Sequence, residues 1–520
     1  MIRWFTVKFV CLLFRFLGMF KRRAFLNSMQ LPQRTQEKCL KEICREMTET
    51  DYGKKYGLSG VTDYQSFKAS VPLINYEDIA DVIEAQKNGE YSITPGKILF
   101  YENTSGSSSK CKAIPYNSQL KKSFYNMFLI WVSDVLKNHS LNTGKMFLSI
   151  SPGVATDEEG MTDDTDYLSG FGALLLKPFL IKPDGINHVK DPDNYRKILA
   201  LALLAEKDLE IVSVWSPTYF LMILNEIKNH KSDLMKYLEA GCLSVEGQCF
   251  TFKVSQKRLE SLKSKNSFKD YWPELKIISA WDEGFAKQPA EELKSHFPNV
   301  SFQGKGLLST EAPVTVPIIS TEHSLPLIKE CFFEVILLNG ETKMLIDMEL
   351  LEEGELVITQ RSGLLRYRTG DRVKVDSFVG NCPTLTFLGR SGKQVDMHGE
   401  KLTEERAYKS ISPLLDNCPS ILLPVYESSE NSYYCLMIES FTGNLKSLAD
   451  KVDNALKENF HYAVARRNNQ LKALQVCLMD RLNHKYTEIQ MSSGMRWGDI
   501  KIPFLELKIQ YESELKSWFT

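Results

Sequence analysis

Short apolar runs alternate with segments of helical periodicity between residues 118 and 303. Four runs have the length and composition of buried strands: 146–150, 211–215, 275–280 and 300–303. Three segments between them repeat apolar residues every three or four positions and are predicted helices: 193–206, 218–238 and 289–297. This alternation predicts an α/β fold with a mainly parallel sheet that is flanked by helices.

The pattern changes after residue 330. Between 331 and 388, short β-rich runs are separated by Gly, Asn and Asp, which predicts an antiparallel sheet or a small β-barrel-like part. A linker-like turn at 391–393 then predicts a small, mobile α+β domain. In that domain, 421–426 and 433–438 predict a hairpin, and one helix is predicted to bury a stripe that ends with Leu456 and Phe460. We therefore expect a helix at 1–25, a large domain at 26–390 and a small cap domain at 391–520.

Residues 1–25 predict a basic amphipathic helix. Lys8, Arg15 and Arg22 lie seven residues apart and form a narrow stripe. Opposite this stripe lies a broad apolar face made of Trp4, Phe5, Val10, Leu13 and Leu17. The uncharged run at 9–14 is too short to span a membrane. Two interpretations stay open: a helix docked on the protein's own surface, or one in weak contact with a membrane surface.

Composition and charge exclude several classes of protein. The 520 residues carry 64 Lys+Arg and 65 Asp+Glu, so no global field would attract nucleic acid, and we expect no such partner. Hydrophobic residues at 43% and charged residues at 25% argue against extensive disorder. The eleven cysteines contain no C-x-x-C pair, which predicts buried thiols in a reducing compartment, the cytoplasm.

Residues 104–112, with the sequence TSGSSSKCK, are the first candidate site. Small hydroxyl residues around a glycine offer N–H and O–H donors to an anion, and lysines add positive charge. These groups suit the terminal phosphates of a nucleotide. A solvated serine-rich turn is the alternative.

A second candidate, residues 304–311 with the sequence GKGLLSTE, follows the predicted strand at 300–303. Such a loop delivers the Glu311 carboxylate to a strand end, where parallel sheets bind ligands. A carboxylate oxygen there could bind Mg²⁺. The alternative is a helix capped by Thr310, with Glu311 in its first turn.

Three more polar positions follow later in the chain. Residues 367–371, YRTGD, predict a hairpin-type turn in which Asp371 accepts hydrogen bonds from ribose hydroxyls or only caps the turn. Arg390 ends the β-rich segment and is available to ribose, to phosphate or to a surface ion pair. Pro503 keeps Ile502 extended, so that Lys501 projects from the body as a reactive group or as a plain surface lysine.

The order of these motifs resembles the acyl-adenylate-forming superfamily of acyl-CoA synthetases, adenylation domains and luciferase. Within it, the chain is most similar to the Gretchen Hagen (auxin-responsive promoter) family of acyl-acid amido synthetases. The segments that carry this resemblance are Val71-Pro72-Leu73 with Tyr76, 279–284, 304–308 and 496–503. Ser109 and Cys111 depart from the Gly and Pro common in the superfamily's phosphate loop, and Lys393 lies near a hinge position where many members have Asp.

The resemblance implies adenylation of a carboxylic acid by ATP with Mg, followed by transfer of the acyl group to an amine. Lys501 and Glu311 would be catalytic, and Glu311 would also bind the metal. The implied nucleotide-binding residues are Thr104, Ser105, Gly106, Ser107, Ser108, Lys112, Ser309, Thr310, Tyr367, Asp371 and Arg390. The 104–108 loop and Lys112 would hold the β- and γ-phosphates, Asp371 and Arg390 the ribose, and the other three the adenine.

The partners implied are a small carboxylic acid and an amino acid, and we expect a monomer. Four aromatic residues would line the acid pocket or belong to the core: Trp215, Tyr219, Trp281 and Phe285. An acyl-CoA ligase shares the adenylate intermediate and is the first alternative function. The second is a catalytically silent nucleotide-binding protein at a membrane surface.

Overall fold

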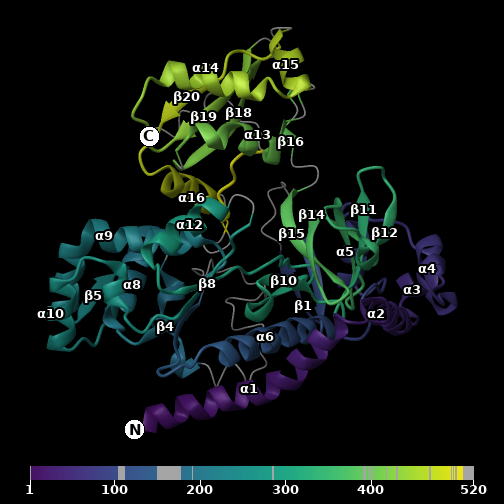
Figure 1. Cartoon of the computed structure of the whole chain (residues 1–520), viewed down its shortest axis with the longest axis horizontal. Coiled ribbons are helices and arrows are strands. Elements are labelled where there is room, and N and C mark those ends of the chain that lie inside the picture. The colour runs from purple at the N-terminus through teal and green to yellow at the C-terminus, as the bar shows by residue number, and fades with distance from the viewer. Residues whose placement is uncertain are drawn as a thin grey trace. The chain divides into compact units, whose positions relative to one another are not determined.

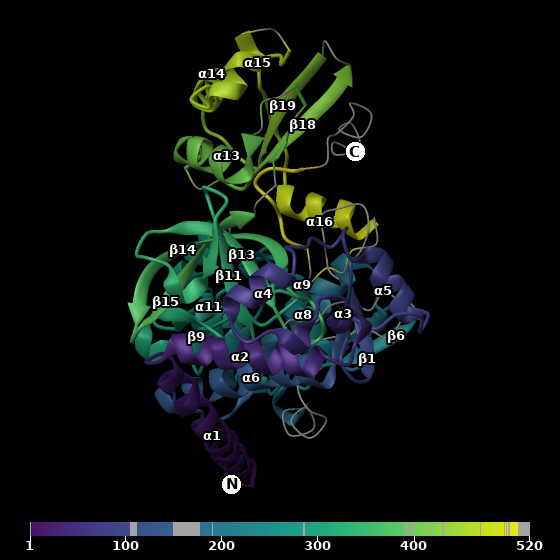
Figure 2. The same cartoon turned by 90° about the vertical axis from the view of Figure 1, so that its right-hand side faces the viewer.

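The computed structural model of the chain consists of two compact units, Met1–Phe387 and Leu388–Thr520, called the N-terminal and C-terminal units below. The structure describes 2–103, 112–148, 177–189, 191–283 and 286–390. It also describes 394–507, apart from 396, 399, 401, 417, 429–430, 468–469, 493–494, 496 and 498–499. Figures 1 and 2 show the elements of both units.

The N-terminal unit contains a parallel sheet with the strand order β3-β4-β7-β8. Every neighbouring pair in this sheet is parallel. The four strands are Lys145–Leu148, Leu209–Ser213, Ile277–Ser279 and Ser301–Gln303. All residues of β4 and β7 are buried, as expected for strands that helices cover on both faces. The predicted helix-flanked, mainly parallel sheet is confirmed.

The helices around this sheet begin and end at residues that favour helix termini. α8 (Pro192–Ala205) and α9 (Pro217–Ala240) both start with proline, whose missing N–H would have no helical partner there. α9 ends before Gly241, which has a φ of 72°. The other elements of this region are α10 (Gln256–Ser264), α11 (Phe268–Tyr271), α12 (Lys287–His296), β5 (Cys242–Val245) and β6 (Gln248–Thr251).

The predicted β-rich segment forms a five-stranded antiparallel sheet with the order β12-β11-β13-β14-β15. In chain order the strands are β11 (Phe332–Leu337), β12 (Thr342–Met344), β13 (Glu353–Thr359), β14 (Tyr367–Val379) and β15 (Cys382–Arg390). A hairpin of β9 (Thr315–Ile318) and β10 (His323–Pro326) precedes this sheet.

Helices and a hairpin from the first 138 residues pack against the five-stranded sheet. They are α2 (Pro32–Met47), α3 (Asp51–Lys55), α4 (Tyr64–Ser70), α5 (Ala80–Lys87), β1 (Ile98–Asn103), β2 (Ala113–Asn117) and α6 (Ser118–Asn138). Ile43, Phe67, Ile114, Phe124 and Phe333 are buried in one shared core. The core therefore connects segments that are far apart in the sequence.

α1 (Ile2–Ser28) packs along α6, as both views show. Val7, Val10 and Phe14 are buried there against Leu129 and Phe179. None of the helices in the described part of the chain is both long enough and apolar enough to cross a membrane.

The rotation of α1 differs in part from the predicted one. Lys8 and Arg22 turn toward the protein, where Lys8 Nζ donates to the Leu141 carbonyl (2.8 Å) and Arg22 pairs with Asp134 (2.7 Å). Leu17, expected on the apolar docking face, is 41% exposed. Long-range polar partners, which the helical pattern cannot show, decided this rotation.

The C-terminal unit contains the sheet β18-β19-β20. β18 (Ser420–Ser428) and β19 (Asn431–Ile438) form the predicted hairpin, and β20 (Gln475–Leu478) adds in parallel. The remaining elements are β16 (Gln394–Val395), β17 (Leu402–Thr403), α13 (Glu404–Ile411), α14 (Leu445–Leu456), α15 (Phe460–Arg467) and α16 (Leu482–Ser492). The stripe predicted to include Phe460 was wrong there, because α14 ends at Leu456 and Phe460 starts α15 with 71% exposure.

The buried ion pair beneath α1 yields a stability prediction. Asp134 is fully buried and also accepts the Ile319 N–H (2.7 Å). Asp134→Ala leaves the Arg22 guanidinium and that N–H without their acceptor, so we expect the free energy of unfolding to fall by about 3 kcal/mol. Urea denaturation measures this loss. Asp134→Asn keeps an acceptor oxygen and should lose clearly less; equal stability of the parent and the Ala variant would contradict the prediction.

Candidate functional site

Part of the predicted site lies outside the described residues. This applies to five residues of the phosphate loop and one aromatic residue: Thr104, Ser105, Gly106, Ser107, Ser108 and Phe285. The backbone of Arg390 ends β15, but its side chain is also outside the described set. The described part of the site therefore begins at Lys112, immediately before β2.

Lys112 lies against a tyrosine from the motif that follows α4. Its Nζ is 5.6 Å from the centroid of the Tyr76 ring, a distance at which a cation is attracted by the ring face. The Tyr76 hydroxyl accepts the N–H of Ala113, the first residue of β2 (2.8 Å). Tyr76 therefore holds the point at which the 104–111 loop rejoins the described chain.

Residues 309–312 form a tight turn that presents Glu311. The Ser309 N–H donates to the Ala312 carbonyl (3.3 Å), and the Ala312 N–H donates to Ser309 Oγ (3.3 Å). Leu308 and Pro313 form a β-bridge across the turn. The helix proposed as an alternative at Thr310 is therefore wrong, because the next regular element is β9.

Glu311 is a mostly buried residue, with 7% of its surface exposed. None of the described residues forms a hydrogen bond or an ion pair with it. A carboxylate without such a partner could bind a cation. The neighbouring Thr310 carbonyl accepts the hydroxyl of Tyr116 in β2 (2.7 Å), which fixes this turn to the strand after the phosphate loop.

The YRTGD segment lies inside a strand, so the predicted hairpin-type turn is wrong. Residues 367–379 form β14, and 369–371 face the single residue Leu356 of β13 as a β-bulge. Gly370 has a φ of 75°, which glycine adopts without the strain of a Cβ atom. Thr369 Oγ1 donates to the Leu356 carbonyl (2.9 Å) and accepts the Asp371 N–H (3.0 Å).

Two predicted ligands of the nucleotide on β14 are buried. Asp371 is 3% exposed, and Tyr367 is 1% exposed within the hydrophobic core. The bulge re-aims Asp371 relative to a regular strand, as bulges near functional sites commonly do. The Tyr367 side chain contributes to packing, whereas its contact with adenine stays a prediction.

One extended segment connects β14 to the tyrosine beside Lys112. Ile74 bridges Tyr367 in parallel, with its N–H donating to the Arg366 carbonyl (3.1 Å) and its carbonyl accepting the Arg368 N–H (2.8 Å). Two residues later, Tyr76 contacts β2. The Lys112 end of the loop, the Glu311 turn and the β14 bulge are thus connected through hydrogen bonds to β2 and to the 74–76 segment.

The carboxyl ends of β4, β7 and β8 carry a second cluster of polar and aromatic side chains. Lys305 Nζ donates to Ser213 Oγ (2.8 Å) and lies 4.7 Å from the centroid of the Trp215 ring. Ser279 and Gln303 are register partners, and in the described structure Ser279 Oγ and Gln303 Nε2 are buried without a hydrogen-bond partner. Unpaired buried polar atoms at a strand end fit a ligand or a bound water.

The aromatic candidates divide between core and edge. Tyr219 is buried and its ring stacks on Phe147 at a centroid distance of 6.3 Å. Tyr219 therefore belongs to the core, the alternative that the sequence left open. Trp215 and Trp281 are only part-buried, and the Trp281 ring lies 5.5 Å from that of Phe387. For these two residues, a role in the acid pocket stays a prediction.

Glu283 was not identified from the sequence as a titrating group. Burial raises its pKa to about 7, although the Phe387 N–H, which donates to Oε2 (3.0 Å), opposes this shift. Burial also raises the pKa of the adjacent Asp282. In the sequence, the two consecutive carboxylates close to the end of a predicted strand could have indicated a titrating group. Their burial, which raises the pKa values, depends on the tertiary structure.

Lys501 is an exposed residue of the C-terminal unit. The chain around it is fixed: Ile500 and Phe504 are buried, and the N–H of Phe504 donates to Glu404 Oε1 (2.8 Å). Leu505 then bridges Leu422 of β18 in parallel. The prediction of a stiff segment that presents Lys501 at the surface agrees with these contacts.

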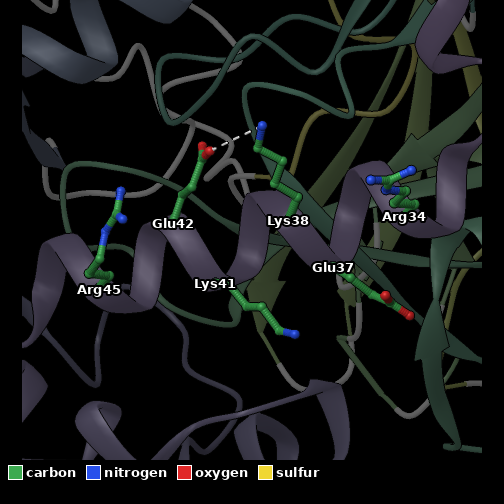
Figure 3. A pocket seen from close by; sticks show the side chains of 6 residues that line it. All are labelled: Arg34, Glu37, Lys38, Lys41, Glu42 and Arg45. Carbon is green, nitrogen blue, oxygen red and sulfur yellow. Dashed lines mark ion pairs between the residues drawn. The ribbon is translucent and has the colours of Figure 1, made fainter.

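Figure 3 shows a surface hollow of about 420 Å³ that does not involve the predicted site. Six charged side chains of α2 line it: Arg34, Glu37, Lys38, Lys41, Glu42 and Arg45. Glu42 already pairs with Arg361 (2.8 Å) and more loosely with Lys38 (3.9 Å). A hollow made by mixed charges on a single helix is an ordinary solvated surface.

Three sequence profiles of the GH3 family match the chain. The GH3 family N-terminal domain matches residues 21–302, the central domain 324–390 and the C-terminal domain 411–508. The chain is 23% identical to jasmonoyl-L-amino acid synthetase JAR6 of Nicotiana attenuata, with 90% of each sequence covered. It is 25% identical to the 4-substituted benzoates-glutamate ligase GH3.12 of Arabidopsis thaliana, with 72% of each covered.

Two solved structures show the same fold. The AtGH3.15 acyl acid amido synthetase in complex with 2,4-DB matches with a TM-score of 0.81 and 20% identity, over 96% of this chain and 95% of that one. A 2-hydroxyisobutyryl-CoA ligase in its postadenylation state matches with a TM-score of 0.53 and 11% identity, over 88% and 91%. The α/β architecture is therefore that of acyl acid amido synthetases and of a CoA ligase.

The raised pKa of Glu283 predicts a pH-dependent stability. Between its unfolded value near 4.5 and about 7, the folded state retains a proton that the unfolded state releases, so stability falls as the pH rises. Glu283→Gln removes this titration. The free energy of unfolding of the variant, relative to that of the parent, should therefore increase by about 2 kcal/mol as the pH rises from about 5 to about 8. Urea denaturation across this range tests it. Glu291→Gln, at an exposed position on α12, is the control; parallel pH curves for the parent and Glu283→Gln would refute the prediction.

Proposed function

The chain belongs to the GH3 family, and we propose that it is an ATP-dependent ligase that adenylates a small carboxylic acid and transfers the acyl group to an amino acid. The relatives named above are amido synthetases and an amino acid ligase. The family assignment alone leaves open which residues act. The described contacts support assignments for Lys112, Glu311, Asp371 and Lys501.

The observation that carries this proposal is the convergence of three motifs on β2. The phosphate loop ends at Lys112, directly before β2, and the Glu311 turn binds β2 through Tyr116. The β14 bulge with Asp371 is tied to the same strand through Ile74 and Tyr76. One nucleotide can therefore meet a phosphate-binding loop, a carboxylate and a ribose-binding group within a single network.

The residues fit a nucleotide with its cation. Glu311 is a mostly buried residue that offers a carboxylate without a described partner, the donor type that Mg²⁺ prefers. When bound, Mg²⁺ would neutralise negative charge on the phosphates. The 104–108 loop and Lys112 would hold the β- and γ-phosphates. Asp371 and Arg390 would bind the ribose, and Ser309, Thr310 and Tyr367 would form the adenine side.

The acid substrate would bind at the carboxyl edge of the parallel sheet. Ser279 Oγ and Gln303 Nε2 are buried there without partners in the described structure, and they could bind a polar group of the acid. Trp215, Trp281 and Phe285 would provide apolar contact surface. Tyr219 would support this pocket from the core rather than line it.

The first half-reaction joins two anions. A carboxylate oxygen of the acid forms a bond to the α-phosphorus, the bond from that phosphorus to the bridging oxygen of the β-phosphate breaks, and pyrophosphate leaves. Negative charge at the α-phosphate must be stabilised as this happens. We assign this role to Lys501, which a movement of the C-terminal unit would deliver.

The second half-reaction forms the amide. The amine nitrogen of an amino acid attacks the acyl carbon, the bond to the AMP oxygen breaks, and the ammonium group loses its protons to solvent or to a base. A thiol nucleophile would give a CoA thioester instead. We also propose that the protein is a monomer in the cytoplasm, a location that rests on the cysteine pattern of the sequence.

The function is tested by a library of carboxylic acids assayed for pyrophosphate release with ATP and Mg²⁺. Each active acid is then offered the amino acids or CoA, and mass spectrometry identifies the product. We expect an acyl-amino acid conjugate with release of AMP. Exclusive formation of a thioester would replace this proposal by a CoA ligase, and absence of acid-dependent pyrophosphate release from the folded protein would overturn both.

Two substitutions should separate chemistry from nucleotide binding. Lys501→Ala removes the charge assigned to the α-phosphate, so acid-dependent ATP–pyrophosphate exchange should fall by about a thousandfold, while ATP affinity by calorimetry stays within about threefold. Asp371→Ala should instead weaken ATP binding by about tenfold, since it removes a ribose acceptor. Full exchange activity in Lys501→Ala would contradict the first assignment, and unchanged affinity in Asp371→Ala the second.

A further inference from the structure

The outward face of α1 is apolar, although α1 is firmly docked on α6. Four large apolar side chains on this face are mostly exposed: Phe9 (64%), Leu12 (65%), Phe16 (57%) and Phe20 (60%). They recur every three or four residues and therefore form one stripe along the helix. Met19 and Leu17 on either side of the stripe are also exposed. The stripe reaches across more than three helical turns.

Contacts on the opposite face fix this orientation. A Cβ atom at Gly18 would lie only 2.5 Å from the Leu129 carbonyl oxygen, so the glycine allows α1 to approach α6 closely. The pair between Arg22 and the buried Asp134 locks the same turn of the helix. Val10 and Phe14 fill the interface below. Rotating α1 to bury the stripe would break the ion pair and expose these residues.

The charged residues of α1 itself are all positive. α1 contains six Lys and Arg residues and no Asp or Glu. Arg15, Lys21 and Arg23 are exposed. Arg23 follows Phe20 by three residues and therefore continues the stripe. Arg15 lies four residues before Met19, on one flank of the stripe. Lys21 lies four residues after Leu17, on the other flank. Apolar rings between cations match the depth profile of an anionic bilayer surface.

From this match we propose that the outward face of α1 binds the surface of an anionic lipid bilayer, with the stripe inserted among the acyl chains and the cations on the headgroups. A second copy of this chain fits less well, because pairing two such faces would oppose cation to cation without any acidic residue of α1 between them. The proposal is independent of the ligase reaction. Binding through this one helix would hold the N-terminal unit at a membrane surface, with the axis of α1 parallel to that surface.

Flotation of the full chain with lipid vesicles tests this proposal. We expect binding to vesicles of phosphatidylcholine mixed with phosphatidylserine and much weaker binding to phosphatidylcholine alone. Leu12→Glu combined with Phe16→Glu should reduce binding by about tenfold or more, since it removes inserted apolar surface and adds negative charge. Arg15→Gln and Arg23→Gln should each reduce binding about fivefold, and added salt should act in the same direction.

A matched control introduces the same residue at another exposed leucine. Leu338→Glu, at a position 79% exposed in the turn after β11, should bind vesicles as the parent does. Thermal unfolding and ATP–pyrophosphate exchange establish that the α1 variants stay folded.

Three results would overturn the proposal: no flotation with either vesicle, equal flotation of the Leu12→Glu/Phe16→Glu variant, or equal binding to both vesicle types. A parent that sediments as a dimer, becomes monomeric in that variant and does not float would instead assign the stripe to a second copy.

Discussion

The buried ion pair between Arg366 and Glu334 is the constraint on which the N-terminal unit depends. Arg366 Nε and Nη2 both contact the carboxylate of the fully buried Glu334, at distances of 2.9–3.1 Å. Arg366 Nη1 donates to the carbonyls of Val71 (2.8 Å) and Lys68 (3.2 Å), and the Tyr64 hydroxyl also donates to Glu334 (3.0 Å). Both charges are thereby paired and hydrogen-bonded, which is the condition under which burial of charge is tolerated.

This pair determines where several elements of the proposed nucleotide site lie. It fixes the chain after α4 on the five-stranded sheet, so that Ile74 pairs with β14 and Tyr76 meets the start of β2. Arg366 itself has a φ of 47°, a strained value for a residue with a Cβ atom, which its network of contacts maintains. The strain lies immediately before the strand that carries the bulge and Asp371. In the proposed function, the attraction of ATP would depend on local cations, since the net charge of the whole chain is only -1.

The two units contribute different kinds of group to the proposed reaction. In the proposed function the N-terminal unit supplies the carboxylates of Glu311 and Asp371, two mostly buried residues, and a low-dielectric surrounding strengthens electrostatic contacts with a ligand. The C-terminal unit supplies an exposed lysine on a segment fixed by Glu404 and β18. A cation on a rigid segment loses little conformational freedom when it meets a phosphate. This division suits the proposed reaction, in which the lysine would stabilise negative charge at the α-phosphate only during the first half-reaction.

The sequence by itself determined the elements whose signals are local. The alternation of apolar runs identified the parallel sheet, and the order of short motifs identified the family. It could not determine that YRTGD forms a bulge, because the bulge exists only opposite Leu356 of β13. Nor could it choose the turn at Glu311 over a helix, since contacts with Tyr116 and with Pro313 decide that conformation. The rotation of α1, the burial of Tyr219 and the raised pKa of Glu283 likewise arise from residues far apart in the chain, and only the tertiary structure brings those residues together.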